Sequence, residues 1–218
     1  LPPRLLARLD MDDGVPDDLR AFVVIPALIN KPADIDTVLE NLEMHYLRNS
    51  DANLRFALLA DFADAPRETM LEDEKLIAHA GERLAALNAR YAASQPFYFF
   101  LRRRRWNAKE RLWIGWERKR GKLAMFNQLL LDPTATTDYN VQLGDLSVLP
   151  TIRYVITLDA DTILPADSAQ ALIGTLAHPL NRAVYEADSP VIERGYTVLQ
   201  PRVEILQIAA EQSLFTRL

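Results

Sequence analysis

The sequence has no cysteine and no long hydrophobic run, and each absence excludes a class of protein. With no cysteine among its 218 residues, the chain forms no disulfide and no thiolate metal site. Hydrophobic residues make up 49% of the chain, yet no apolar run reaches the roughly 18 residues that a membrane-spanning helix needs. A chain of this length and composition can form one sizeable α/β core, which we expect in preference to two small domains.

Histidines are few, and no secretion signal is visible. His45, His79 and His178 lack the spacing of metal ligands and are expected on helix surfaces. The sequence starts Leu-Pro-Pro-Arg, without an initiator methionine or a signal peptide, so we expect a piece of a longer protein. Residues 1–20 are polar and predict a lead-in segment, and residues 21–218 predict part of a single domain.

Positive charge is concentrated in one stretch of an acidic chain. The net charge is −5 at pH 7, so the composition does not favour a nucleic-acid partner. Residues 102–122 nevertheless contain ten Lys or Arg and only two Glu. We expect an anion to bind near these cations.

Apolar runs alternate with amphipathic stretches along the chain. The apolar runs predict strands at 21–29, 54–60, 97–101, 153–158 and 196–203. The other stretches predict helices that begin near Asp34, near Pro66 and after Gly121, further helices at 166–178 and 204–218, and a loop at 132–152. Pro26 is expected to end the regular pairing of the first strand. The alternation predicts an α/β fold, with a mostly parallel sheet and helices on both faces.

Two carboxylates, Asp159 and Asp161, follow the apolar run that begins at Tyr154. Residues i and i+2 of a strand share a face, so both carboxylates can point the same way. Two neighbouring anions repel each other, and a divalent cation such as Mg²⁺ or Mn²⁺ removes that cost. The carboxyl ends of parallel strands are also where open α/β sheets bind ligands. The pair therefore predicts a metal and a phosphate-bearing ligand; the alternative is a loop with solvated acids.

Other polar residues are expected at the same edge of the sheet. Asp61 closes the second strand, where an acid can accept hydrogen bonds from a base or a ribose; alternatively, it only caps a helix. Gly121 and Lys122 are expected to open a helix, and a helix N-terminus beside a cation favours a phosphate. The stretch from Arg102 to Trp106 can clamp a pyrophosphate or stack on a ring. Four successive arginines cannot all face one site, so at least two are expected to be solvated or paired with acids.

Three stretches resemble known functional motifs but depart from them in spacing, residue type or order. Gly115 to Leu123 departs from a Walker A loop, because it has five residues between the glycines and leucine in the Ser/Thr position. The Asp159 motif comes too late in the chain for a haloacid-dehalogenase-type phosphatase, and no Asp-Asp pair follows it. Arg105 and Trp106 precede the Asp-X-Asp pair, whereas the Gln-X-X-Arg-Trp motif of processive glycan synthases follows it.

Taken in order, several motifs resemble the donor half of a glycosyltransferase-A fold of the family-2-like type. They are Val24-Ile25-Pro26-Ala27, Asp61, Gly121-Lys122 with Asn127, Leu158-Asp159-Ala160-Asp161 and Val198-Leu199-Gln200-Pro201. Longer stretches resemble the glycosyltransferase domain of bacterial cyclic β-1,2-glucan synthases. They are Arg103-Arg104-Arg105-Trp106-Asn107, residues 113–122, residues 154–165 and Leu199-Gln200-Pro201-Arg202. The resemblance covers residues 5–218.

The resemblance implies UDP-glucose as the donor, a β-glucan acceptor and product, and Mg²⁺ or Mn²⁺ as the cofactor. It also implies a place within a very large membrane-embedded synthase, on the cytoplasmic face of the bacterial inner membrane. Asp61 would contact the uridine, Asp159 and Asp161 would hold the metal and the ribose or diphosphate, and Lys122 would offset the diphosphate charge. The remaining substrate-binding candidates are Pro26, Arg105, Trp106, Asn127 and Gln200.

An α-linked donor and a β-linked product require inversion and one general base. In such families this base lies in the acceptor half, and Glu193, Glu204 and Glu211 match no pattern for it. We therefore expect a fold that is incomplete at its C-terminus, which binds donor but does not complete a transfer alone. Two alternatives stay open: a family-2-like polysaccharide synthase with another sugar donor, and a non-enzymatic module that binds polyanions.

Overall fold

The computed structural model describes residues 5–187 and 189–202, which fall into two compact units. The larger unit is Leu9–Gly174, and the smaller combines the residues before and after it. The predicted lead-in at 1–20 and single domain at 21–218 stay predictions.

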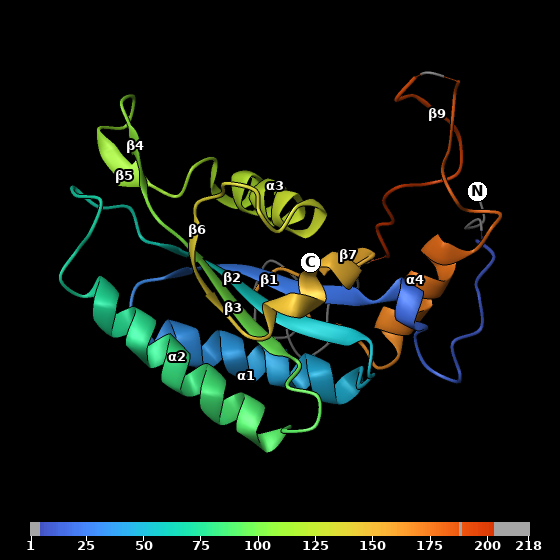
Figure 1. Cartoon of the computed structure of the whole chain (residues 1–218), viewed down its shortest axis with the longest axis horizontal. Helices are drawn as coiled ribbons and strands as arrows, with labels where there is room; N and C mark the ends of the chain where they lie inside the picture. The colour runs from blue at the N-terminus through green and yellow to red at the C-terminus, as the bar shows by residue number, and fades with distance from the viewer. Residues whose placement is uncertain (1–4, 188, 203–218) are drawn as a thin grey trace, which may run out of the picture. The chain divides into compact units, whose positions relative to one another are not determined.

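A five-stranded sheet forms the centre of the larger unit (Figure 1). Its strands, in spatial order, are β6 (Tyr139–Leu143), β3 (Phe97–Arg102), β2 (Leu54–Phe62), β1 (Ala21–Ile29) and β7 (Tyr154–Thr157). Neighbouring strands from β3 to β7 are parallel, and β6 pairs antiparallel with β3. The chain adds β2 and β3 on one side of β1 and β7 on the other, so the strand order switches between β1 and β7. In sheets of this Rossmann-like type, ligands bind beyond the carboxyl ends of the strands at such a switch.

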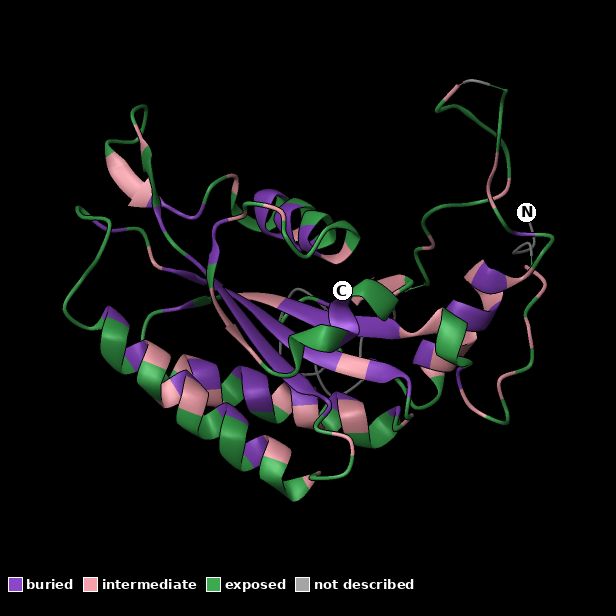
Figure 2. Ribbon diagram, in the orientation of Figure 1, coloured by how far each residue is buried: buried purple, intermediate pink, exposed green. Residues whose placement is uncertain are grey.

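Helices cover both faces of the sheet, as the sequence predicts (Figure 1). Helices α1 (Pro32–Arg48) and α2 (Asp73–Arg90) lie on one face and α3 (Arg118–Leu131) on the other. Alternate residues of β1 serve the two faces: Val23 packs in a core with Ile35 and Leu84, whereas Phe22 packs against Phe126 with ring centroids 5.5 Å apart. The central strands are therefore buried on both sides (Figure 2). This arrangement confirms the predicted α/β class.

Shorter elements complete the described residues. They are the 3₁₀ helices η1 (Asp17–Leu19) and η2 (Leu146–Thr151), the hairpin of β4 (Arg105–Asn107) and β5 (Leu112–Ile114), helix α4 (Ser168–Ala177), and the hairpin of β8 (Val184–Tyr185) and β9 (Ile192–Arg194). In the smaller unit, the Asn181 amide donates to the carbonyls of Ala7 and Thr175, each at 2.7 Å.

Pro26 does not end the pairing of β1 with β2, which continues to Ile29. Pairing with β7 stops at Val24, whose carbonyl accepts from the Leu158 N–H at 2.9 Å. In a parallel ladder, alternate residues bond to alternate neighbours, so Pro26 faces β7 like Val24. The missing N–H of Pro26 therefore affects the β7 side only, and the expectation is right for β7 and wrong for β2.

Other predicted elements differ from the structure. Helix α2 begins at Asp73, well after Pro66, because Ala65 pairs through its backbone with Trp113 of β5. The predicted loop at 132–152 contains β6 and η2. Residues 196–202 form no strand, and the predicted helix at 204–218 lies outside the described residues.

Candidate functional site

The acidic pair lies in a turn just beyond β7. Strand β7 ends at Thr157, and the Thr162 N–H donates to the Asp159 carbonyl at 2.9 Å to close the turn. Alternation along a strand therefore does not align the two carboxylates, contrary to the prediction. Asp159 and Asp161 are both exposed, and Asp159 pairs with the Lys119 ammonium at the start of α3. The pair nevertheless lies at the carboxyl end of β7, beside the switch in strand order, where the sequence predicts it.

The loop after this turn is fixed by α1. The Leu164 N–H donates to Nδ1 of His45 at 3.4 Å, and Asn49 donates to the Pro165 carbonyl at 3.1 Å and accepts from the Ala169 N–H at 3.0 Å. His45 and Asn49 are only 2% and 0% exposed. The prediction that His45 lies on a helix surface is therefore wrong, because His45 replaces an apolar residue on the inward face of α1 to satisfy a buried loop amide.

Lowering the pH is expected to destabilise the protein through His45. Burial, and secondarily the nearby Arg48, lower the pKa of His45 below 6.5. Between that lowered pKa and about 6.5, the unfolded chain binds a proton that the folded chain does not, so stability is complete above about pH 6.5 and falls below it. Urea unfolding should show the free energy of unfolding decreasing by up to about 1.4 kcal/mol per pH unit in this window. His45→Gln should reduce this slope, and an unchanged slope would contradict the assignment.

Asp61 is buried in an ion cluster with two cations. Arg102 Nε and Nη2 donate to the two Asp61 oxygens at 2.7 and 2.9 Å, and Lys122 Nζ lies 3.1 Å from Oδ2. The side chains of Asp61, Arg102 and Lys122 are 3%, 0% and 4% exposed. Lys122 also donates to the Ala27 carbonyl at 2.6 Å, next to Pro26. Burial lowers the pKa of Lys122, although Asp61 acts in the opposite direction.

The segment before α3 wraps around this cluster. Arg102 donates to the carbonyls of Trp116 and Arg118 at 3.0 and 3.1 Å, which satisfies most of its guanidinium. A Cβ on Gly115 would lie 2.5 Å from an Asp61 oxygen, so only glycine fits beside this carboxylate. Glu117 and Arg118 have positive φ values of 48° and 52°, a conformation that non-glycine residues seldom adopt. Helix α3 begins at Arg118 and not at Gly121, so Lys122 lies in its second turn. The prediction that Gly121 and Lys122 open the helix is wrong.

Arg103, Arg104 and Arg105, which follow Arg102 in the basic stretch, also pair with acids. Arg104 Nη1 and Nη2 donate to the Asp73 oxygens at 2.6 and 3.1 Å, and its guanidinium lies over the Phe62 ring. Arg103 and Arg105 share the buried Asp138, with Nε to oxygen distances of 3.2 and 2.6 Å. The expectation that at least two of these arginines pair with acids is confirmed for all four.

The remaining substrate-binding candidates are spread over several elements. Arg105 and Trp106 lie in the β4–β5 hairpin, where the Trp106 ring is 52% exposed and packs against Trp113 with centroids 5.9 Å apart. Asn127 is exposed on α3, and Gln200 is exposed in the smaller unit. The structure therefore brings Asp61 and Lys122 together, with Pro26 next to the Ala27 carbonyl that Lys122 binds, and it joins Asp159 to α3 through Lys119.

Sequence reasoning missed two groups at this edge of the sheet. The first is the pairing of Arg102, predicted only as part of a pyrophosphate clamp, with both oxygens of Asp61. The second is the polar edge of α1, to which His45 and Asn49 belong. Asp61 and Arg102 lie in direct register near the ends of adjacent parallel strands, and the structure alone reveals this register.

The acidic turn can take part in a metal site without completing one. Among the described residues, no three His, Cys, Asp or Glu side chains lie together as a metal site. Mg²⁺ at phosphate sites commonly takes one or two carboxylates, with substrate oxygens and water as the other ligands. Two exposed carboxylates fit a cation shared with a diphosphate, provided that the Lys119 ammonium moves from Asp159 to the diphosphate.

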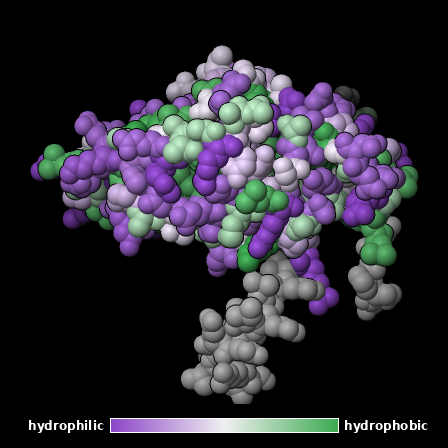
Figure 3. All heavy atoms as spheres, turned by 90° about the horizontal axis from the view of Figure 1, so that it is seen from below, coloured by the Kyte–Doolittle hydropathy of each residue, from purple (hydrophilic) through white to green (hydrophobic). Residues whose placement is uncertain are grey.

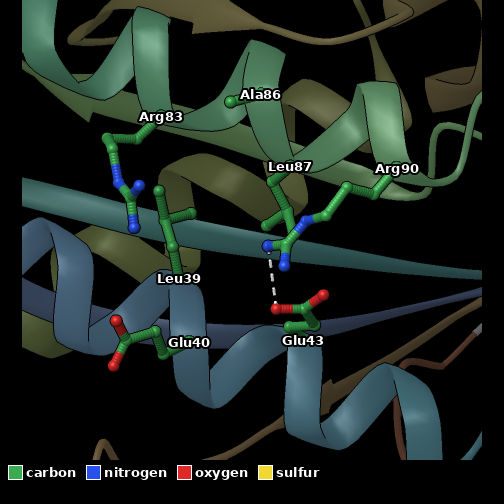
Figure 4. Close-up of a pocket in the computed structure, with 7 residues that line it drawn as sticks. All are labelled: Leu39, Glu40, Glu43, Arg83, Ala86, Leu87 and Arg90. Carbon is green, nitrogen blue, oxygen red and sulfur yellow. Dashed lines mark hydrogen bonds and ion pairs between the residues drawn. The ribbon is translucent and has the colours of Figure 1, made fainter.

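A hollow between α1 and α2 lies away from this edge. It is lined by Leu39, Glu40, Glu43, Arg83, Ala86, Leu87 and Arg90. Arg90 reaches across it to Glu43, at 2.9 Å (Figure 4). The face that these two helices present is mostly hydrophilic, with small, separate hydrophobic groups (Figure 3). We therefore do not place the site here.

Comparison with known proteins gives one informative likeness. No family model matches the chain. The chain is 41% identical, over 99% of its length, to part of the cyclic β-(1,2)-glucan synthase NdvB of Rhizobium meliloti (strain 1021). It spans 8% of the length of that curated relative. The resemblance to cyclic β-1,2-glucan synthases that the sequence predicts is confirmed. Over the part of the chain that the structure describes, no helix combines the length and apolar character needed to cross a membrane.

Proposed function

We propose that this chain is the nucleotide-sugar-binding part of an inverting glucosyltransferase that builds β-1,2-glucan from UDP-glucose. The likeness to a cyclic β-(1,2)-glucan synthase supports the reaction class. One observation carries the site: the exposed acids Asp159 and Asp161 lie beside the switch in strand order, next to the cation Lys119. On this proposal the chain works within a larger membrane-embedded synthase, on the cytoplasmic side of the membrane.

The proposed chemistry follows from charge. Cleavage of the anomeric C–O bond leaves UDP with additional negative charge, which fixed cations stabilise without reorganising. Lys119 can reach this charge, because it is half-exposed and already meets the acidic turn. A divalent cation bound at Asp159 and Asp161 would supply Lewis-acid stabilisation of the same charge. Transfer with inversion also needs a general base on the acceptor, and that this chain binds donor without completing a transfer stays a prediction.

Asp61 is proposed to hold the uridine end of the donor. Both of its oxygens already accept from Arg102 and Lys122. Among the described residues Oδ1 accepts only from Arg102 Nε, so it can accept a further hydrogen bond, but the Asp61 side chain is 3% exposed and a direct contact with uridine requires the surrounding residues to move. Lys122 is the cation more easily displaced, because it meets only Oδ2, whereas Arg102 binds both oxygens of Asp61.

The polyanion-binding alternative depends on free cations in the basic stretch. Arg102 to Arg105 pair with three carboxylates of the fold, those of Asp61, Asp138 and Asp73. These acids offset part of the charge of the four arginines, which counts against the alternative without excluding it. The other alternative, a family-2-like synthase with a different donor, is separated by comparing UDP-glucose with UDP-N-acetylglucosamine and a GDP-sugar.

Isothermal titration of UDP with and without Mn²⁺ tests the proposed site. We expect UDP binding that strengthens with Mn²⁺ and weakens at least about tenfold in Asp161→Ala, since the variant loses one of two carboxylate ligands. Asp18→Ala is the matched control, because Asp18 is exposed in η1 at the opposite end of the sheet. A UDP affinity that changes neither with Mn²⁺ nor in Asp161→Ala would contradict the site. Salt-sensitive heparin binding that Asp161→Ala leaves unchanged would instead favour the polyanion module.

A further inference from the structure

Helix α1 carries a polar edge that runs alongside the acidic turn and its loop. Asn41 and His45 are four residues apart and so lie on one side of the helix, and Asn49, four residues further on, caps its C-terminus. The Asn41 amide donates to the Ala160 carbonyl at 3.2 Å, and His45 and Asn49 bond to the backbone further along the same loop. The bonds from Asn41 and from His45 each join residues 119 positions apart. Residues four apart in the helix therefore bond to residues four apart in the loop.

The loop depends on this edge for its backbone hydrogen bonds. The Thr162 N–H closes the turn, whereas the Leu164 and Ala169 N–H groups are satisfied by side chains of α1. Pro165 has no N–H, and its carbonyl is taken by Asn49. Buried backbone groups are costly to leave unpaired, so α1 fixes the path of the chain after β7.

The three side chains hold different parts of that path. His45 and Asn49 are buried and fix the base of the loop, three or more residues beyond Asp161. Asn41 is only half-buried, and its acceptor is the carbonyl of Ala160, the residue between the two acids. A hydrogen bond to this carbonyl restrains rotation of the peptide group between Ala160 and Asp161.

We propose that Asn41 is a positioning residue for the acidic pair. By holding the Ala160 carbonyl, it keeps the Asp159 and Asp161 carboxylates in the arrangement that binds a divalent cation together with a nucleoside diphosphate. Asn41 touches neither the cation nor the nucleotide, and it acts through the backbone of the turn. The inference rests on the proposed function, since it assigns a role at the same site.

Residues that orient metal ligands typically change metal affinity by about 10–100-fold when they are replaced. Asn41→Leu keeps a similar volume but has no donor for the Ala160 carbonyl. We expect the Mn²⁺ concentration that half-saturates its UDP binding to rise about tenfold. UDP affinity without metal, and the melting temperature, should stay close to those of the unchanged chain. The electron paramagnetic resonance signal of free Mn²⁺, titrated with protein and UDP, reports the same loss independently.

Two further variants separate positioning from a general structural role. Asn41→Gln keeps the amide donor and should recover part of the Mn²⁺ dependence. Thr37→Val is the matched control one turn earlier, because among the described residues the Thr37 hydroxyl bonds only to the Ala33 carbonyl within α1. It should bind Mn²⁺ and UDP like the unchanged chain.

The outcomes are distinguishable from failure of the proposed function. If the unchanged chain shows Mn²⁺-dependent UDP binding and Asn41→Leu matches it, the role of Asn41 is wrong and the site stands. If Asn41→Leu weakens binding equally with and without Mn²⁺, or if Asn41→Gln recovers nothing, positioning is also overturned. If the unchanged chain shows no Mn²⁺ dependence, both proposals fall together.

Discussion

Asp61→Ala is expected to lower the free energy of unfolding by about 3–5 kcal/mol, because it removes one partner of a buried ion cluster. Arg102 would keep its charge with no exposed side-chain surface, while Lys122 can release its proton and relieve part of the cost. Urea or thermal unfolding followed by circular dichroism measures the change. A domain is commonly stable by only about 5–15 kcal/mol, so this loss is large.

Asp64→Ala is the matched control for this substitution. Asp64 pairs with Arg118, but these side chains are 28% and 47% exposed, so the pair is screened by water. We expect a loss of about 1 kcal/mol or less. A cost for Asp61→Ala no larger than that of Asp64→Ala would show that the buried cluster does not stabilise the fold.

Gly121→Ala is expected to destabilise the protein by about 3 kcal/mol, the upper part of the usual range for overpacking. Helix propensity alone predicts the opposite sign, since alanine is favoured over glycine in a helix by about 1 kcal/mol. A Cβ at this position would lie 2.2 Å from the Trp116 carbonyl oxygen, which belongs to the backbone and already accepts from Arg102. The substitution must therefore shift the start of α3 and loosen the cluster around Asp61.

Gly81→Ala provides the comparison, because Gly81 lies inside α2 with no foreign atom closer than 3.9 Å to a built Cβ. At this position no steric clash opposes the higher helix propensity of alanine, and we expect the free energy of unfolding to rise by about 0.5–1 kcal/mol. Melting temperatures of the two variants should move in opposite directions. A stabilised Gly121→Ala would show that the chain before α3 yields without cost.

The central strands could be predicted from the sequence because they are buried on both faces and read as continuous apolar runs. The edge strand β6 was missed although Asn140 and Gln142 alternate with apolar residues, a pattern typical of a half-buried strand; at five residues it is shorter than the central strands β1 and β2. The β4–β5 hairpin has three-residue strands, one of which begins with Arg105. The two strands pair with each other, and Trp113 of β5 also pairs with Ala65, a contact that no local pattern reveals.

The candidate site was predictable in its position but not in its contacts. The topology places Asp61 and Asp159 at strand ends, and both can be found from the apolar runs before them. The partners are distant in sequence: Arg102 lies 41 residues from Asp61, and Asn41 lies 119 residues from Ala160. Side-chain pairing over such distances depends on the register of strands and helices, which a single sequence does not specify.

Pro26 ends the pairing of β1 on the β7 side and leaves its pairing with β2 intact. Had residue 26 carried an N–H, the ladder between β1 and β7 could have continued past Val24, and the segment with Asp159 would have been drawn into the sheet. The proline leaves β1 joined to β2 while the chain after β7 is free to turn away and meet α1. An uncharged, unreactive side chain thus determines where the chain leaves the sheet between β1 and β7.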